Sequence, residues 1–132
     1  MIKEEYKYSE ITGKIIGAAI KVHNERGPGF PEYIYQRALE IEFRHLSVQN
    51  VREKEHSVFY QNEMIGKRRV DFVVAEKIMV ELKAVDKLDN LSLSRSLNYL
   101  KAFNLEVGLL INFGSDKLEF KRLINNKLKP AS

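Results

Sequence analysis

The run from Val107 to Phe113 (VGLLINF) constrains the fold of this chain more than any other feature. It is nearly continuously apolar, has the length of a strand, and lacks the polar alternation of a half-exposed strand. This pattern is typical of a strand buried on both faces of a sheet. Such a strand needs a covering layer on each side, so the run indicates a sheet flanked by helices. With 132 residues, 44% of them hydrophobic, the chain can build one core, and we expect a single domain over residues 1–132.

The elements around this run follow from apolar spacing and turn signals. The predicted elements, in chain order, are helices over 9–24 and 31–46, strands over 51–60, 64–74 and 78–85, a helix over 91–103, and strands over 107–113 and 117–121. We expect Ser9 to cap the first helix and Asp89-Asn90 the third. A three-strand meander followed by a helical crossover to the buried strand predicts a mixed β-sheet flanked by helices. The fold class is therefore α/β (α+β), with the order ααβββαββ.

Composition removes several classes of function. The chain has no cysteine, which excludes disulfides, thiol catalysis, iron–sulfur clusters and cysteine-ligated zinc, and which fits a reducing compartment. The polar start of the chain, MIKEEYKYSE, is unlike a signal peptide. No apolar stretch approaches the roughly eighteen residues of a membrane span. We therefore expect a cytoplasmic protein that does not enter a membrane.

The charge balance permits a polyanionic partner without demanding one. The 22 Lys and Arg against 18 Asp and Glu residues give a formal net charge of +4. Many basic soluble domains bind no nucleic acid, so charge alone does not overturn the simpler interpretation that these residues are solvated surface. The basic residues are grouped at Lys67-Arg68-Arg69 and towards the C-terminal end.

Charged residues interrupt two of the predicted strands. Asp71 lies between valines and a phenylalanine, while Glu81 and Lys83 interrupt the run from Ile78 to Val85. Because side chains alternate along a strand, Glu81 and Lys83 share one face. If residues 75–77 form a three-residue hairpin loop, counting back from the loop places Asp71 opposite Glu81. Directly opposed residues of an antiparallel pair have Cβ atoms about 5 Å apart.

Two carboxylates that close repel each other, and both ionise readily only with a cation between them. Oxygen ligands of this kind suit Mg²⁺ or Mn²⁺. Lys83 beside them can hold a water and stabilise negative charge that develops on a phosphate. Asp71, Glu81 and Lys83 would thus form a site for metal-assisted phosphodiester hydrolysis. The alternative is an ordinary cross-strand Glu/Lys pairing on the surface.

Two further places carry candidate residues. Glu32 lies in the first turn of the second helix, on the same side as Tyr35, and is therefore aimed inward; a favourable interaction with the helix dipole explains it equally well. Arg95 and Tyr99 lie four residues apart on the third helix and could reach a phosphate. A packed arginine stem and a tyrosine at the edge of the core are the alternative.

These residues belong to a longer pattern. The stretch Gly27-Pro-Gly-Phe-Pro-Glu32-Tyr-Ile-Tyr35 resembles the G-x-G-x-x-E-x-x-Y signature of the GxxExxY proteins, a group assigned to the PD-(D/E)XK nuclease-like superfamily. The resemblance runs from about Ile11 to Ile124. It includes, in order, Val22-His23, Val70-Asp71, Val80-Glu-Leu-Lys-Ala84, Leu97-Asn-Tyr-Leu-Lys101 and Gly108-Leu-Leu-Ile-Asn-Phe-Gly114.

The resemblance implies a restriction-endonuclease-like core and Mg²⁺-dependent (or Mn²⁺-dependent) cleavage of phosphodiesters. It implies that Asp71, Glu81 and the backbone carbonyl of Leu82 hold the metal ion. It also implies that Glu32 completes the site and that Lys83 orients the attacking water. The implied catalytic residues are therefore Glu32, Asp71, Glu81 and Lys83.

The sequence departs from the family at two positions. Val70 replaces the proline that names the superfamily motif, and Arg95-x-x-x-Tyr99 stands where relatives have Gln-x-x-x-Tyr. An arginine there either contacts a substrate phosphate, which we favour, or pairs with Asp71 or Glu81 and competes with the metal.

Together these observations lead us to expect a Mg²⁺-dependent endonuclease that acts on nucleic acid, on DNA or RNA, with DNA favoured over RNA. The expected substrate-binding residues are Arg95, Tyr99, Lys67, Arg68 and Arg69. Because 132 residues leave no room for a separate recognition domain, we expect a homodimer or a protein partner to supply specificity. The alternative is a module that keeps the fold and binds nucleic acid or protein without cleaving.

Overall fold

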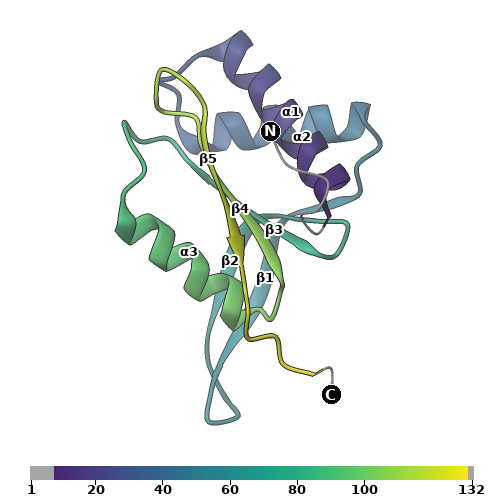
Figure 1. Cartoon of the computed structure of the whole chain (residues 1–132), viewed down its shortest axis with the longest axis vertical. Coiled ribbons are helices and arrows are strands. Elements are labelled where there is room, and N and C mark those ends of the chain that lie inside the picture. The colour runs from purple at the N-terminus through teal and green to yellow at the C-terminus, as the bar shows by residue number, and fades with distance from the viewer. Residues whose placement is uncertain (1–7, 131–132) are drawn as a thin grey trace.

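A five-stranded mixed sheet and three helices make up the computed structural model, which describes residues 8–130 (Figure 1). The elements are α1 (Ser9–Arg26), α2 (Glu32–His45), β1 (Asn50–Tyr60), β2 (Glu63–Val74), β3 (Ile78–Lys83), α3 (Asn90–Ala102), β4 (Val107–Asn112) and β5 (Glu119–Ile124). The strands lie in the order β1-β2-β3-β4-β5. Only β3 and β4 pair in parallel, through the α3 crossover. The expected α+β class and element order are confirmed.

The two faces of the sheet have separate cores. Apolar side chains of α1 and α2 pack with β2, β3 and β4 in one cluster, whose largest fully buried members are Ile15, Tyr35, Leu39, Phe43, Phe72, Ile78, Leu82, Leu109 and Phe113. The other face packs under α3, with Val70, Val73, Met79, Leu100, Phe103 and Leu110 among its members. Every residue of β4 is buried, so the predicted strand covered on both faces is confirmed.

The helix starts differ in how they are capped. Asp89 caps α3 as expected, since its side chain accepts a hydrogen bond of 2.8 Å from Ser92 N. The expectation for Ser9 was wrong, because Ser9 is already helical and Tyr8 occupies the cap position without a side-chain bond. The hydroxyl of Thr12, which is buried, instead donates a hydrogen bond of 3.1 Å to the backbone oxygen of Tyr8.

A long hairpin projects from the body of the protein at the lower end of the view in Figure 1. The β1–β2 ladder runs from Asn50↔Val74 to Tyr60↔Glu63, whereas β2 pairs with β3 only over Phe72–Val74. Residues 55–69, called the arm below, therefore have no strand partner except each other. An isolated two-stranded ribbon is marginally stable in water, so the arm depends on its base and on its contacts with α3, where His56 stacks on Phe103 and Arg68 bonds Tyr99.

No helix in the described part of the chain is both long and apolar enough to cross a membrane. The polar N-terminal residues 1–7, on which the absence of a signal peptide was argued, lie outside the described residues.

Candidate active site

The β2–β3 hairpin sets the register of the candidate site. Val74 pairs with Ile78, as the count from the sequence predicted, and Phe72 pairs with Val80. The turn between them contains no glycine. Ala75 and Glu76 instead adopt positive φ values of 52° and 61°, and Lys77 N donates to the Val74 carbonyl oxygen at 3.0 Å. Two consecutive residues with positive φ are the mark of a type I′ turn, whose twist suits a tight hairpin.

Asp71 and Glu81 lie one step beyond the last paired residues of this ladder. There the side chains take over the hydrogen bonds of the backbone. Asp71 N donates to Glu81 Oε1 at 3.1 Å, and Leu82 N donates to Asp71 Oδ2 at 2.8 Å. The two carboxylates are thus interlocked with the opposite strand at the point where β2 and β3 separate.

A residue that the sequence did not single out, Gln36, holds the other oxygen of Asp71. Gln36 Nε2 donates to Asp71 Oδ1 at 2.9 Å, and Gln36 is itself only 5% exposed. Arg52 of β1 donates to Gln36 Oε1 at 3.4 Å and to Glu40 Oε2 at 3.1 Å. Gln36 follows Glu32 by four residues, so helical spacing would have placed both on one face of α2.

Glu32 owes its position to the loop before α2. Gly27 and Gly29 have φ values of 68° and 111°, which L side chains rarely adopt. The Tyr35 hydroxyl donates to the Gly27 carbonyl oxygen at 2.6 Å and accepts from Phe30 N at 3.1 Å, while its ring stacks on Phe113 at 4.7 Å. The glycines and the tyrosine of the motif therefore fix the turn from which Glu32 begins the helix.

Burial, and after it the negative charge of Asp71, raises the pKa of Glu81 to about 8. The hydrogen bond from Asp71 N and the positive charge of Lys83 oppose this rise without cancelling it. Burial likewise raises the pKa of Asp71, against the hydrogen bonds from Leu82 N and Gln36. Partial burial raises the pKa of Glu32, with the charge of Asp71 as the second cause. The three carboxyl groups therefore share one electrostatic environment that disfavours their full ionisation.

Lys83 provides the positive charge of this cluster, because it lowers the pKa of Glu32, Asp71 and Glu81 alike. The segment after it is fixed by Asn112, a fully buried residue of β4. Asn112 Oδ1 accepts from Val85 N at 3.0 Å, and Asn112 Nδ2 donates to the Val85 carbonyl oxygen at 2.8 Å. Asn112 was not among the expected site residues, although a polar residue inside the apolar run was a visible signal.

Within residues 8–130, the expected substrate-binding residues form no ion pair with Asp71 or Glu81. Arg95 is exposed, and its charge acts on Asp89; within residues 8–130, no ion pair joins it to Asp71 or Glu81. Among these residues, Arg95 therefore does not pair with the carboxylates, as it would have to do in order to compete with a metal ion. Arg68 Nη2 donates to the Tyr99 hydroxyl, with its guanidinium 5.0 Å from the centre of the Tyr99 ring.

The remaining two basic residues lie on the arm. Lys67 Nζ and Arg69 Nε are each 3.6 Å from an oxygen of Glu55, and all three side chains are largely exposed. Their charges are thus partly neutralised within the hairpin itself.

The donor set suits a magnesium-like ion in its chemistry. Magnesium is typically held by one or two carboxylates and keeps several waters, and carboxylates with raised pKa values are stabilised by a cation. Among residues 8–130, no three His, Cys, Asp or Glu side chains are gathered in a ready metal-binding arrangement. Asp71 and Glu81, linked by the hydrogen bond from Asp71 N to Glu81 Oε1, therefore fit a metal ion as a pair.

Comparison with known proteins agrees with this fold. The crystal structure of SSO0001 superposes with a TM-score of 0.54 at 20% sequence identity, over 71% of this chain and 50% of that one, so the chain spans about half the length of SSO0001. This likeness supports the fold. No curated protein sequence matches the chain. The model of the PD-(D/E)XK nuclease superfamily matches residues 9–123. The chain therefore belongs to the PD-(D/E)XK nuclease superfamily.

Proposed function

We propose that this protein hydrolyses phosphodiester bonds of nucleic acid with Mg²⁺ or Mn²⁺, at the site of Asp71, Glu81 and Lys83. Members of the superfamily are nucleases that generally use divalent metals, and the superfamily therefore implies a nucleic-acid substrate. The observation that carries the proposal is the interlocking of Asp71 and Glu81 at the end of the β2–β3 ladder, with the Lys83 charge acting on both.

Each residue of the site has a distinct role in this proposal. Asp71, Glu81 and the backbone carbonyl of Leu82 would hold the metal, and Glu32 would complete the site. A bound divalent cation would polarise the phosphoryl group and lower the pKa of a water. The Lys83 ammonium group orients that water and stabilises the negative charge that develops on the phosphate.

We assign the chain to the GxxExxY group within the superfamily. Both the sequence and the structure support this assignment. The Tyr35 hydroxyl donates a hydrogen bond to the Gly27 carbonyl oxygen, so the last residue of the motif contacts the first. The spacing of the motif thus has a physical reason in this chain.

The substrate in this proposal is DNA rather than RNA, with Arg95, Tyr99 and the basic residues Lys67, Arg68 and Arg69 as phosphate contacts. Arg95 supports this role through its exposure and its lack of a pairing with the carboxylates among residues 8–130. Arg68 and Tyr99 already hold each other in place. A second copy of the chain, or a protein partner, would supply specificity.

A cleavage assay tests the proposal. Plasmid DNA, single-stranded DNA and RNA are incubated with Mg²⁺, with Mn²⁺ or with EDTA. The wild-type protein should cleave only with metal, and Asp71→Asn or Lys83→Met should lower the rate by roughly a hundredfold or more. Glu25→Gln, an exposed carboxylate on α1, serves as the matched control and should cleave like the wild type. Cleavage that survives in EDTA or in Asp71→Asn contradicts the proposed site.

One observation favours a second function, a module that binds nucleic acid without cleaving it. Both oxygens of Asp71 already accept hydrogen bonds from protein groups, Gln36 Nε2 and Leu82 N. If these bonds persist, a metal cannot use Asp71 fully. In that case the wild-type protein should retard DNA in a gel equally well with Mg²⁺ and with EDTA, and should leave it intact.

A further inference from the structure

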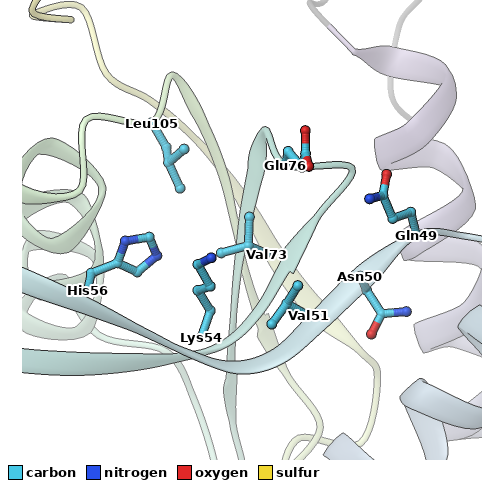
Figure 2. Close-up of a pocket in the computed structure, with 8 residues that line it drawn as sticks. All are labelled: Gln49, Asn50, Val51, Lys54, His56, Val73, Glu76 and Leu105. Carbon is cyan, nitrogen blue, oxygen red and sulfur yellow. The ribbon is translucent and has the colours of Figure 1, made fainter. Parts of the chain in front are cut away.

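A cavity of about 300 Å³ opens beside β1, the β2–β3 turn and the segment after α3 (Figure 2). Its apolar lining comes from Val51, Val73 and Leu105. The polar lining residues are Gln49, Asn50, Lys54, His56 and Glu76. None of these residues belongs to the candidate active site, and the cavity has the size at which pockets begin to hold small organic ligands.

His56 presents an unused polar atom to this cavity. Its Nε2 is shielded from solvent and has no hydrogen-bond partner among residues 8–130. The ring is held by stacking on Phe103, with ring centres 4.3 Å apart and planes inclined by 18°. A buried polar atom without a partner is costly, so a fixed imidazole nitrogen beside a cavity indicates a group that is bound there.

Charges of both signs lie on the same cavity. Lys54 and His56 are alternate residues of β1 and so share a face, and both side chains point into the cavity in Figure 2. Lys54 and Glu76 have no ion-pair partner among residues 8–130, not even each other. Burial, and after it the charge of Lys54, lowers the pKa of His56, so the imidazole is neutral at neutral pH. The cavity therefore offers one cation, one anion, one neutral imidazole and an apolar wall.

We propose that this cavity binds a single nucleotide whose base is unpaired, with the phosphate at Lys54 and the base against Val51, Val73 and Leu105. His56 Nε2 then bonds a polar group on the base edge, and Glu76 accepts from a sugar hydroxyl or an exocyclic amine. The proposal rests on the proposed action on nucleic acid, and it names the substrate class as strands with unpaired bases.

Two observations select a nucleotide over a simple anion. A carboxylate at Glu76 repels a ligand that carries only negative charge, and the apolar wall needs a flat, apolar body to cover it.

Nuclear magnetic resonance in EDTA tests the cavity without any cleavage. Isotope-labelled protein is titrated with dAMP and, separately, with inorganic phosphate. We expect dAMP to shift the amide signals of Val51, Val73 and Leu105, and phosphate to bind roughly tenfold more weakly or not at all. Lys54→Met should weaken dAMP binding roughly tenfold or more, the scale of a hydrogen bond to a charged group. Lys14→Met, an exposed lysine of α1, is the matched control and should bind dAMP like the wild type.

Val51→Trp provides a second, independent variant. Val51 is 46% exposed, so the larger ring is tolerated at the surface and fills the mouth of the cavity. Loss of dAMP binding in this variant, with unchanged signals elsewhere, supports the site. Equal dAMP binding by wild type, Lys54→Met and Val51→Trp overturns it, as does the absence of any binding at millimolar dAMP.

Competition shows which source of nucleotide the cavity uses. A short single strand that displaces dAMP identifies the nucleotide as part of a strand, and displacement by neither strand nor duplex identifies a free mononucleotide. If a fully paired duplex displaces dAMP as effectively as a single strand does, the requirement for an unpaired base is contradicted.

If dAMP binds but no strand is cleaved with metal, the cavity stands and the nuclease proposal fails. Cleavage without any nucleotide binding supports the nuclease proposal and overturns the cavity.

Discussion

The two ends of strand β2 both carry charged residues, but in opposite surroundings. The inner end, residues 70–74, pairs with β1 and in part with β3, and four of its five residues are buried. The outer end, residues 63–69, pairs only with β1 and is exposed throughout. At the inner end, burial raises the pKa of Asp71. On the arm, Lys67 and Arg69 pair with Glu55 in the open, where ion pairs contribute little. Burial thus changes the titration of the acidic group at the inner end, whereas the basic groups of the arm remain in contact with solvent.

The largest expected effect compares two phenylalanines. Phe72 at the inner end is fully buried and meets Phe43 edge to face at 5.1 Å, while Phe59 on the arm is 63% exposed. Phe72→Ala should lower the free energy of unfolding by about 3–5 kcal/mol, and Phe59→Ala by less than about 0.5 kcal/mol. Urea denaturation followed by circular dichroism measures both. A cost above about 2 kcal/mol for Phe59→Ala would mean that the arm is packed against something in solution.

The second prediction uses the buried carboxyl group Glu81. The pKa of Glu81 is about 8 in the folded protein, whereas its ordinary value is 4.5. Between pH 4.5 and pH 8, the folded state therefore keeps a proton that the unfolded state has lost. Stability from this group is therefore present below pH 4.5 and is lost as pH rises towards 8, by up to about 1.4 kcal/mol per pH unit.

Glu81→Gln removes this dependence, because glutamine does not ionise. The variant should become more stable relative to the wild type as pH rises from 5 to 9, in urea denaturation at each pH. Glu63→Gln at the exposed end of β2 is the matched control and should follow the wild-type curve. Parallel curves for wild type and Glu81→Gln would show that the Glu81 carboxyl is not buried as described.

The smallest expected effect compares two tyrosine hydroxyls. The buried Tyr35 hydroxyl binds the Gly27 carbonyl oxygen and Phe30 N, whereas Tyr60 on the arm is 63% exposed. Tyr35→Phe should cost about 1–2 kcal/mol of stability, since it leaves two backbone groups without a partner, and Tyr60→Phe should cost nothing measurable. Thermal unfolding measures the difference. Equal melting temperatures for both variants would remove the structural role given to the tyrosine of the motif.

Much of the fold was predictable because local patterns dominate it. The continuous apolar run identified β4, and counting back from a three-residue loop at residues 75–77 predicted the register of the β2–β3 hairpin. The missing glycine in the turn did not prevent that register, since Ala75 and Glu76 adopt positive φ values instead. The Ser9 cap was wrong because helix boundaries depend on one or two residues of local geometry.

The surroundings of the candidate site were less predictable. The sequence singled out Asp71, Glu81, Lys83 and Glu32, and the structure brings their charges together. The hydrogen bonds of Gln36 and Arg52 to this site come from α2 and β1. Such contacts depend on how a helix and a distant strand pack on the sheet, which periodicity does not encode. The pairing of Arg68 with Tyr99 was missed for the same reason.

The most direct test of the central claim is the binding of Mn²⁺ to the cluster of Asp71 and Glu81, measured by isothermal titration calorimetry at pH 8. The wild-type protein should bind Mn²⁺, and its melting temperature should rise with Mn²⁺ concentration, because a ligand that binds only the folded state stabilises it. Asp71→Asn should lose both effects, while Glu25→Gln should keep them. Unchanged Mn²⁺ binding in Asp71→Asn, or no binding by the wild type, would contradict the account.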